Sequence, residues 1–267
     1  MILNVGGRTD IVNYYSEWLM NRIHEGFVYS RNPLFPKQIT KYDLNPQKID
    51  CMMFCSKNYT PILKYMKEIN SKYRIICHYT ITAYGKDVEP KVPSIDESIE
   101  TLIKLSNIIG KEKVIWRYDP LLITENYNIE HLIKTFEYIA NKIHKHISLA
   151  IFSFVEMYKK LEVNMPEIIP FTEKDKIVLA TEIGKIAKKY NIPIQTCGTD
   201  VDYTKYGINL SGCTTTKILE KANGCKYCYA NKKPENIIKN YKLHNPKSPI
   251  LIDKIRQDDI IKNADQT

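Results

Sequence analysis

Short apolar runs alternate along this chain with longer amphipathic stretches, and this alternation restricts the fold more than any other feature of the sequence. Ile49–Phe54 and Arg74–Tyr79 are typical of buried strands, and Pro61–Ile69 between them is typical of a helix. The other predicted strands are Ile2–Val5, Val114–Trp116, Ile147–Phe152 and Ile192–Gln195, and the other predicted helices are Tyr14–Ile23, Asp96–Ile109, Ile129–Ile143 and Lys174–Tyr190. Strands that alternate with helices of this length pair in parallel, so the pattern predicts an α/β protein.

The strands are apolar runs without polar alternation, as expected when both faces of a parallel sheet are covered. We therefore expect a full or partial parallel (β/α) barrel with a cysteine-rich C-terminal extension, and a doubly wound open sheet is the second interpretation. Residues 1–204 would form the barrel-like domain, 205–252 a cysteine-rich segment packed on it, and 253–267 a tail without regular structure from about Gln257. Phe27–Tyr29 and Gln38–Tyr42 could form a small hairpin.

The composition excludes several classes of protein. With 43% hydrophobic and 26% charged residues, the 267-residue chain is not disordered. It has no apolar stretch of bilayer length and no export signal, so we expect a soluble, cytoplasmic protein with no membrane partner. The net charge of +9 comes from dispersed lysines, which indicate a solvated basic surface. Nucleic acid stays open as a partner, although no basic run supports it.

Polar side chains follow the predicted strands at their carboxyl ends, where the loops of parallel α/β folds form binding sites. Arg8, Lys57 and Arg117 would together bind a phosphate or carboxylate. We predict catalytic roles for Lys57, Arg117 and Asp119, and cofactor contacts for Arg8, Thr9, Asp10, Asn58 and Tyr84. Ser56, Thr80, Thr82, Tyr118, Thr199 and Asp200 belong to the same set. The alternative is that these charges only cap loops and pair with Asp10 and Asp119.

Cysteines form a second candidate site. Cys225 and Cys228 are two residues apart in a Gly-led turn, so both sulfur atoms can reach one metal ion or cluster. Cys197 and Cys213 lie upstream and would complete a four-sulfur site. A redox dithiol or a set of unreactive thiols is the alternative.

The remaining cysteines and two of the histidines have simpler explanations. Cys51 and Cys77 fit the core, because unpaired cysteine is among the most buried residue types. Cys55 lies at the predicted functional edge, and its role stays open. His78 and His244 could bind a metal ion, but ordinary hydrogen-bonded histidines are the better interpretation.

Several separate blocks of the chain resemble one family, the domain of unknown function 1848 family. The blocks are Gly7-Arg8-Thr9-Asp10-Ile11, Tyr15-Ser16-Glu17-Trp18, Arg31-Asn32-Pro33, Ser56-Lys57-Asn58, Ala83-Tyr84-Gly85-Lys86-Asp87-Val88-Glu89-Pro90, Val114-Ile115-Trp116-Arg117-Tyr118-Asp119-Pro120, Cys225-Lys226-Tyr227-Cys228-Tyr229-Ala230 and His244-Asn245-Pro246-Lys247-Ser248-Pro249. The resemblance extends over residues 1 to 252. The family's activity is not known, so the resemblance implies a class of protein and no particular reaction.

The family resembles the radical S-adenosylmethionine enzymes, above all the spore photoproduct lyase type. This resemblance implies a barrel-like α/β fold with a 4Fe-4S cluster at one end, and S-adenosylmethionine as a cofactor. The radical motif is C-x3-C-x2-C, but Lys221 stands where its first cysteine would fall before Cys225. If Cys197, Cys213, Cys225 and Cys228 all bind one cluster, no iron is open for S-adenosylmethionine. The same four thiolates could hold one zinc ion.

Three functions follow from these observations. The first is an iron–sulfur enzyme related to the radical class, with a small-molecule or nucleic-acid substrate at the strand ends. The second is a non-catalytic binding protein in which a four-cysteine zinc or cluster site is structural and the basic pocket binds a phosphate-bearing ligand. The third is a metal-independent enzyme that uses Lys57, Asp119 and Tyr118 as acid and base groups.

Overall fold

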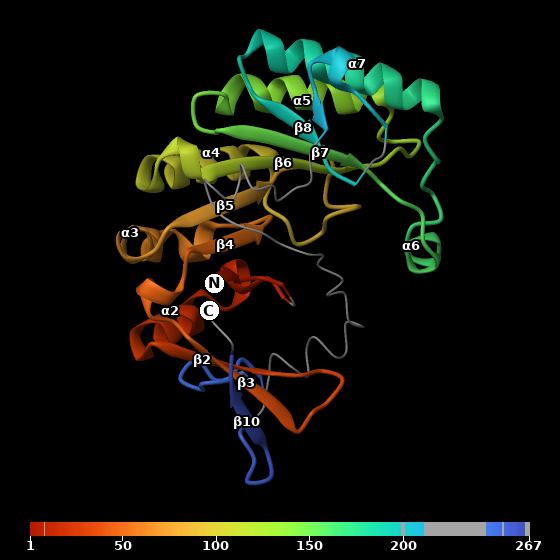
Figure 1. Cartoon of the computed structure of the whole chain (residues 1–267). Coiled ribbons are helices and arrows are strands. Elements are labelled where there is room, and N and C mark those ends of the chain that lie inside the picture. The colour runs from red at the N-terminus through yellow and green to blue at the C-terminus, as the bar shows by residue number, and fades with distance from the viewer. Residues whose placement is uncertain (8, 199–200, 211–243, 253, 265–267) are drawn as a thin grey trace.

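The computed structural model describes residues 1–7, 9–198, 201–210, 244–252 and 254–264 (Figure 1). Within these residues the main element is a seven-stranded sheet in which all neighbouring strands are parallel. The strands are β1 (Ile2–Asn4), β4 (Cys51–Ser56), β5 (Ile75–Thr80), β6 (Val114–Leu121), β7 (Leu149–Phe154), β8 (Ile194–Thr196) and β9 (Asn209–Leu210). The predicted parallel α/β fold is confirmed.

The strands lie across the sheet in the order of the chain, β1-β4-β5-β6-β7-β8-β9. In the described part of the chain β1 and β9 do not pair with each other, so closure into a full barrel is not seen there. The sheet also continues past residue 204, the expected end of the first domain, because β9 pairs with β8.

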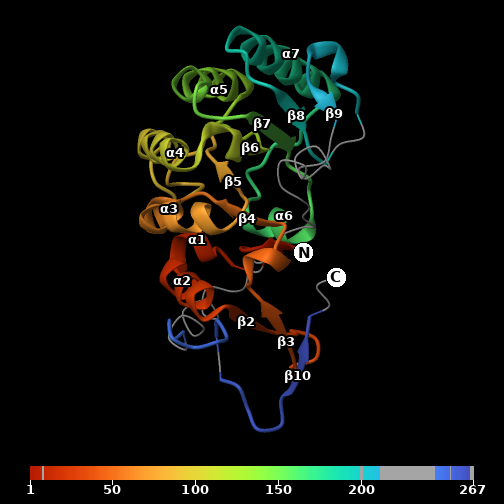
Figure 2. The ribbon, with the colours of Figure 1, turned by 60° about the vertical axis from the view of Figure 1, so that its left-hand side comes forward.

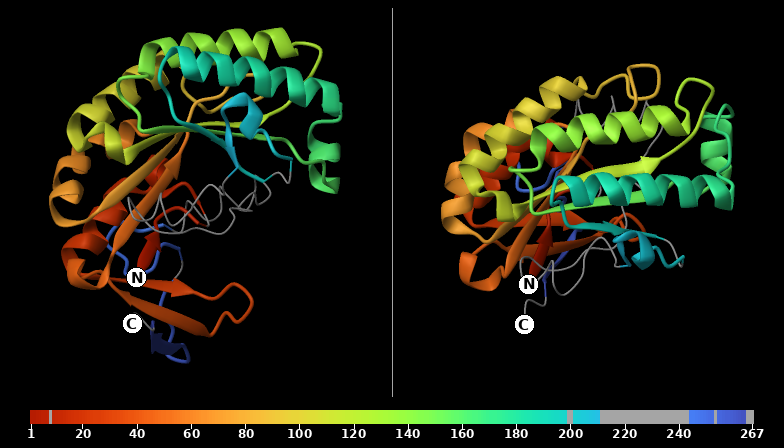
Figure 3. Two further views of the ribbon diagram at one scale, coloured as in Figure 1. Left: turned by 45° about the horizontal axis from the view of Figure 1, so that its top comes forward. Right: turned by 90° about the horizontal axis from the view of Figure 1, so that it is seen from above.

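The helices α3 (Leu63–Lys72), α4 (Ile95–Ile109), α5 (Ile129–Ile143) and α7 (Glu173–Lys189) lie side by side on one face of this sheet (Figures 2 and 3). Each successive strand is added at the same edge of the sheet. Because each crossover between parallel strands is right-handed, every connecting helix lies on the same face. A doubly wound sheet would reverse its strand order and carry helices on both faces, so that second interpretation is wrong. We call the face turned away from these four helices the inner face.

The remaining helices are shorter or lie at the β1 edge. They are α1 (Ile11–Tyr14), α2 (Ser16–Glu25) and α6 (Lys159–Asn164), and short 3-10 helices span Pro46–Lys48, Thr60–Ile62, Lys111–Lys113 and Thr204–Tyr206. In α2 the chain ends the helix at Gly26, whose φ of 77° is in the left-handed region that favours glycine. Among the described residues, no helix combines the length and apolar character that crossing a membrane requires.

The hydrophobic core lies between the sheet and the four helices. Trp116 on β6 stacks on Phe136 of α5 with ring centroids 4.7 Å apart, and Tyr118 packs against the same phenylalanine. Met52 and Phe54 of β4 are also fully buried on this side. Alternate residues of each strand point to opposite faces, so the residues between these core positions face the other way.

A second, three-stranded sheet combines two strands from between β1 and β4 with one from the C-terminal region. The predicted hairpin is present as β2 (Phe27–Arg31) and β3 (Gln38–Asp43), which pair antiparallel. The expectation of an irregular tail from Gln257 is wrong, because β10 (Ile260–Asn263) pairs in parallel with β3. The Arg31 guanidinium holds the carboxylate of Asp259, which precedes β10, with an Nη1–Oδ1 distance of 2.6 Å.

Candidate functional site

Polar side chains gather on the inner face towards the carboxyl ends of the strands. The strand register places Cys55 of β4 opposite His78 of β5, and Thr80 of β5 opposite Arg117 of β6. All four alternate with core residues such as Phe54 and Trp116, so they belong to the inner face. Asp119, Ser153 and Cys197 occupy the same face at the ends of β6, β7 and β8. The carboxyl edge therefore collects Thr80, Arg117, Asp119 and Cys197 from the predicted set, together with Cys55, His78 and Ser153.

The amino-terminal half of the inner face is apolar. Cys51, Ile76, Ile115 and Ile151 form a separate buried cluster, one residue from each of four neighbouring strands. Leu149 and Cys197 pack against this cluster. The inner face thus changes from an apolar floor to a polar edge along the direction of the strands.

Arg117, Asp119 and Ser153 are joined by hydrogen bonds at the polar edge. The Arg117 guanidinium donates to Asp119 Oδ2, with an Nε–Oδ2 distance of 3.0 Å, and the two side chains form an ion pair. The hydroxyl group of Ser153 donates to the other carboxylate oxygen of Asp119. Both ion-pair partners are mostly buried, which limits their rotamers and fixes the guanidinium at the sheet edge.

Lys57 belongs to a separate ion pair. Its ammonium group donates to Glu89, in the loop between β5 and α4, and Thr82 Oγ1 donates to the same carboxylate at 2.8 Å. The structure therefore does not show Lys57 and Arg117 as a joint anion site, because each cation already has a carboxylate partner. Arg8, the third predicted cation, lies outside the described residues, as do Thr199 and Asp200.

His78 is the most unusual polar group of this face. Only 2% of the residue is exposed, and neither ring nitrogen has a hydrogen-bond partner in the described part of the chain. Burial, with a smaller contribution from the Arg117 charge, lowers the pKa of His78 to about 3, so the imidazole is neutral near pH 7. The expectation of an ordinary hydrogen-bonded histidine is therefore wrong for His78. An unsatisfied buried polar group costs about 1–3 kcal/mol, which calls for a functional explanation.

His244 does behave as that expectation describes. Its Nδ1 lies 2.8 Å from the carbonyl oxygen of Leu251, and its ring packs edge-on against Tyr15. His244 thus holds a turn of the chain near α2.

Asp10, Ser56 and Asn58 form a network next to α1. Asp10 caps this helix by accepting from the Asn13 amide at 2.9 Å, and it accepts from Ser56 Oγ at 2.7 Å. Asn58 Nδ2 donates to Asn13 Oδ1 at 2.9 Å. Burial raises the pKa of Asp10, although these hydrogen bonds oppose the shift. Thr9 precedes the cap and its carbonyl oxygen accepts from the Ile11 amide.

Two predicted tyrosines use their hydroxyl groups inside the protein. Tyr84 donates to the carbonyl oxygen of Pro120 at 2.9 Å and accepts from the Leu122 amide at 2.7 Å, so it supports the end of β6. Tyr118 is fully buried on the helix side and donates to the Leu132 carbonyl oxygen at 2.8 Å. Strand alternation separates Tyr118 from Asp119, so the structure does not bring these two together as an acid and base pair.

The cysteines divide into three groups. Cys51 and Cys77 are buried, as expected, whereas Cys55 is exposed at the functional edge. Cys197 is partly buried against the apolar floor of the inner face. Cys213, Cys225 and Cys228 lie outside the described residues, and so does Lys221. Within the described residues, no group of three or more His, Cys, Asp or Glu side chains could hold a metal ion.

Glu89, Ser153 and His78 are site residues that the sequence did not indicate. The available signal was the period-two alternation of β5 and β6, which places His78 on the same face as Arg117. Glu89 had no such signal, because its position depends on the folding of the loop between β5 and α4.

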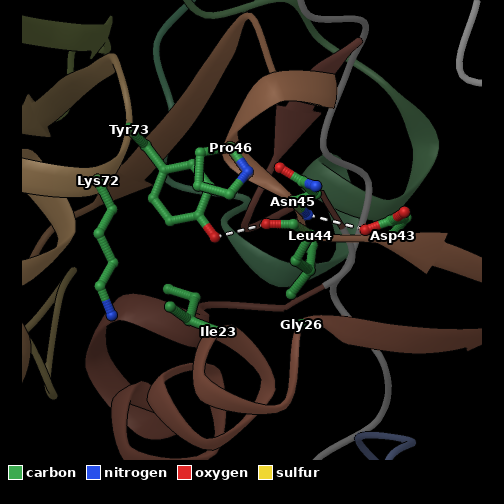
Figure 4. Close-up of a pocket in the computed structure, with 8 residues that line it drawn as sticks. All are labelled: Ile23, Gly26, Asp43, Leu44, Asn45, Pro46, Lys72 and Tyr73. Atoms are coloured by element: carbon green, nitrogen blue, oxygen red, sulfur yellow. Dashed lines mark hydrogen bonds between the residues drawn. The ribbon is translucent and has the colours of Figure 1, made fainter.

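A shallow pocket of about 570 Å³ lies away from this edge (Figure 4). Its lining residues are Ile23, Gly26, Asp43, Leu44, Asn45, Pro46, Lys72 and Tyr73. Most of these residues come just before β4 or β5 in the chain, and the others lie at the end of α2. The pocket therefore lies at the amino-terminal ends of β4 and β5. Tyr73 closes one wall by donating to the Leu44 carbonyl oxygen at 2.6 Å.

Fold and site together define an α/β protein with a parallel sheet whose polar groups converge at the carboxyl edge. The family model with the description Domain of unknown function (DUF1848) matches residues 2–240. The chain therefore belongs to this family, as its sequence blocks indicated. No curated protein and no solved structure matches the chain.

Proposed function

We propose that this protein is an iron–sulfur protein related to the radical S-adenosylmethionine enzymes, with a small-molecule substrate at the carboxyl edge of the inner face. One observation carries the proposal: Cys197 and the Arg117–Asp119–Ser153 network occupy the same face and the same edge. Phe152 pairs with Thr196 in the sheet, so the residues that follow, Ser153 and Cys197, are neighbours on adjacent strands.

Cys197 is a suitable first ligand for the metal site. It follows β8, its amide donates to the Phe152 carbonyl oxygen at 3.1 Å, and it packs on apolar residues. The described residues around it offer no complete ligand set, so the other sulfur ligands would be Cys213, Cys225 and Cys228. Thiolates suit an iron–sulfur cluster or zinc. A bound 4Fe-4S cluster would supply one-electron chemistry at this edge.

The chain's own residues would bind and orient the substrate. Asp119 and Ser153 hold the Arg117 guanidinium in one orientation, so Arg117 would present its charge without losing side-chain freedom on binding. Glu89 holds Lys57 in the same way at the end of β4. Asp10 and Asn58 shape the neighbouring loop. This pre-organisation supports a defined ligand pose.

The paired charges also favour a second function, a non-catalytic binding protein. Both described cations of the edge are neutralised by carboxylates, and Lys221 replaces the first cysteine of the radical motif. In that case the four cysteines would hold zinc or a closed cluster that fastens the C-terminal segment.

Metal analysis of protein purified without oxygen separates the two functions. Iron and acid-labile sulfide near four per chain, with a broad absorption band near ~400 nm, are expected for the cluster. S-adenosylmethionine binding would then show that one iron is open. One zinc per chain without iron would contradict the radical-enzyme proposal and support the binding protein. Protein without metal would contradict both.

A further inference from the structure

His78 lies at the centre of the inner face with its polar atoms unused. Its neighbours across the strands are Cys55 on β4 and Ile115 on β6. Both sides of β5 are occupied by paired strands, so the backbone groups beside His78 belong to the sheet. A hydrogen-bond partner for the ring must therefore come from the space above the inner face.

On the β4 side, the position beside His78 reaches the protein surface. Cys55 is directly opposite His78 in the strand register and is exposed. Towards the amino end of β5, the next residue on the inner face is the apolar Ile76, and Ile115 lies level with His78 on β6. Towards the carboxyl ends it borders Thr80 and Arg117. The imidazole thus marks the boundary between the apolar floor and the polar edge.

The local charge determines which ligand fits. Arg117 lies one pleat further along on the neighbouring strand, and its charge adds to the larger effect of burial in lowering the pKa of His78. Although Asp119 partly neutralises this guanidinium, Arg117 still disfavours a cationic group or a metal ion at the ring. A neutral imidazole beside a guanidinium is instead suited to donate its N–H to an anion.

We propose that His78 contacts the ligand of the inner face directly and donates a hydrogen bond to an oxyanion, either a carboxylate or a phosphate, beside Arg117. The inference rests on the proposed function only for the existence of a ligand at this edge. It does not depend on which metal, if any, the cysteines bind. His78 would then set how deep the oxyanion enters, because the floor below it is apolar.

The test uses inorganic phosphate and malonate as probes of the full-length protein, titrated calorimetrically. His78→Leu removes the donor from a site that tolerates an apolar side chain, and His78→Gln retains an N–H donor. We expect at least tenfold weaker binding for His78→Leu and partial recovery for His78→Gln. His24→Gln is the control, because His24 is exposed on α2 and pairs with Glu68. Whichever probe binds identifies the oxyanion class.

A spectroscopic readout makes the contact specific. In protein with ¹⁵N-labelled histidine, the ring nitrogens of His78 should shift when the probe is added, and those of His24 should not. Unchanged His78 signals together with equal affinity in both variants would overturn the role of His78. If Arg117→Gln then still abolishes binding, the ligand site of the proposed function survives. If neither probe binds the wild-type protein, the oxyanion inference is wrong, whereas the metal analysis still decides the proposed function.

Discussion

The indole nitrogen of Trp18, on α2, donates a hydrogen bond of 2.9 Å to the carbonyl oxygen of Ser248, 230 positions further along the chain. Asn21 and the buried Arg22 donate to the carbonyl oxygens of Pro246 and Lys247 in the same way. Three consecutive backbone carbonyls are thus held by one helix. This contact fixes the chain immediately after the segment that contains Cys213, Cys225 and Cys228.

Replacing Trp18 should therefore weaken the whole fold. Trp18→Phe keeps an aromatic ring but loses the hydrogen bond and some buried volume, so we expect a loss of about 1–3 kcal/mol in the free energy of unfolding. Urea unfolding monitored by circular dichroism measures this loss of stability. Lys247→Ala is the control, because the hydrogen bond from Arg22 goes to the backbone of Lys247 and this residue is exposed, so it should change stability by less than about 0.5 kcal/mol. Equal stability of Trp18→Phe and the wild type would contradict this role.

Asp119 should restrain the affinity of the site for anions. In Asp119→Asn the Arg117 guanidinium keeps a hydrogen-bond acceptor but loses its negative partner. We expect phosphate to bind about 5- to 10-fold more tightly. The variant removes one negative charge a few ångströms from the bound anion, and the fold-change corresponds to that repulsion at an intermediate dielectric constant. The gain should shrink at high salt. Calorimetry at two ionic strengths tests it, with Glu130→Gln on the exposed surface of α5 as control. Weaker binding in Asp119→Asn would contradict this expectation and show that the positioning of Arg117 by the carboxylate outweighs its negative charge.

The three cysteines of β4 and β5 should differ sharply in reactivity. Cys55 is exposed, whereas Cys51 and Cys77 are buried. Burial raises the pKa of Cys51 to about 12, so on the order of one part in ten thousand is thiolate at pH 8. We expect iodoacetamide to modify Cys55 first, as measured by peptide mass spectrometry. All three should react in urea. Labelling of Cys51 at the rate of Cys55 in the folded protein would contradict the burial of Cys51 in the apolar floor of the inner face.

The fold was largely predictable because its elements are regular. The 3.6-residue pattern of Ile129–Ile143 gives the bounds of α5 as observed, and the apolar runs locate every strand of the main sheet except the short β9. The prediction ended β6 at Trp116 because Arg117 and Asp119 are charged, but the strand continues to Leu121. Charged residues remain in a central strand here because they share one face and form an ion pair.

The site was only partly predictable, since its partners come from distant parts of the sequence. Sequence spacing identified Lys57 and Arg117 but not that Glu89 and Asp119 neutralise them. His78 lies within an apolar run, which favours a core role, and only the strand register shows that it shares a face with Arg117. The strand β10 was missed because its pairing with β3 joins residues more than 200 positions apart.

Stability should depend on pH through Asp10. Because burial raises the pKa of this carboxyl in the folded protein, ionisation opposes folding. Below pH 3.8, the pKa of this carboxyl in the unfolded chain, Asp10 is protonated in both states and its full contribution to stability is present. This contribution is lost as pH rises through the higher pKa of the folded protein. Asparagine is an equally good helix cap, so Asp10→Asn should gain stability relative to the wild type as pH rises through this window. Urea unfolding from pH 3.5 to 7 measures the difference, and a relative loss over this range would contradict the sign.

Metal content of the Cys197→Ser variant tests whether Cys197 holds a metal centre at the end of β8. We expect wild-type protein purified without oxygen to carry a sulfur-bound metal centre, and we expect Cys197→Ser to lose most of it while Cys55→Ser retains it. Cys55 is the matched control, since it lies on the same face but four strands away in the sheet order. Circular dichroism of both variants monitors folding. Full metal loading of a folded Cys197→Ser variant would contradict the placement of the centre at the end of β8.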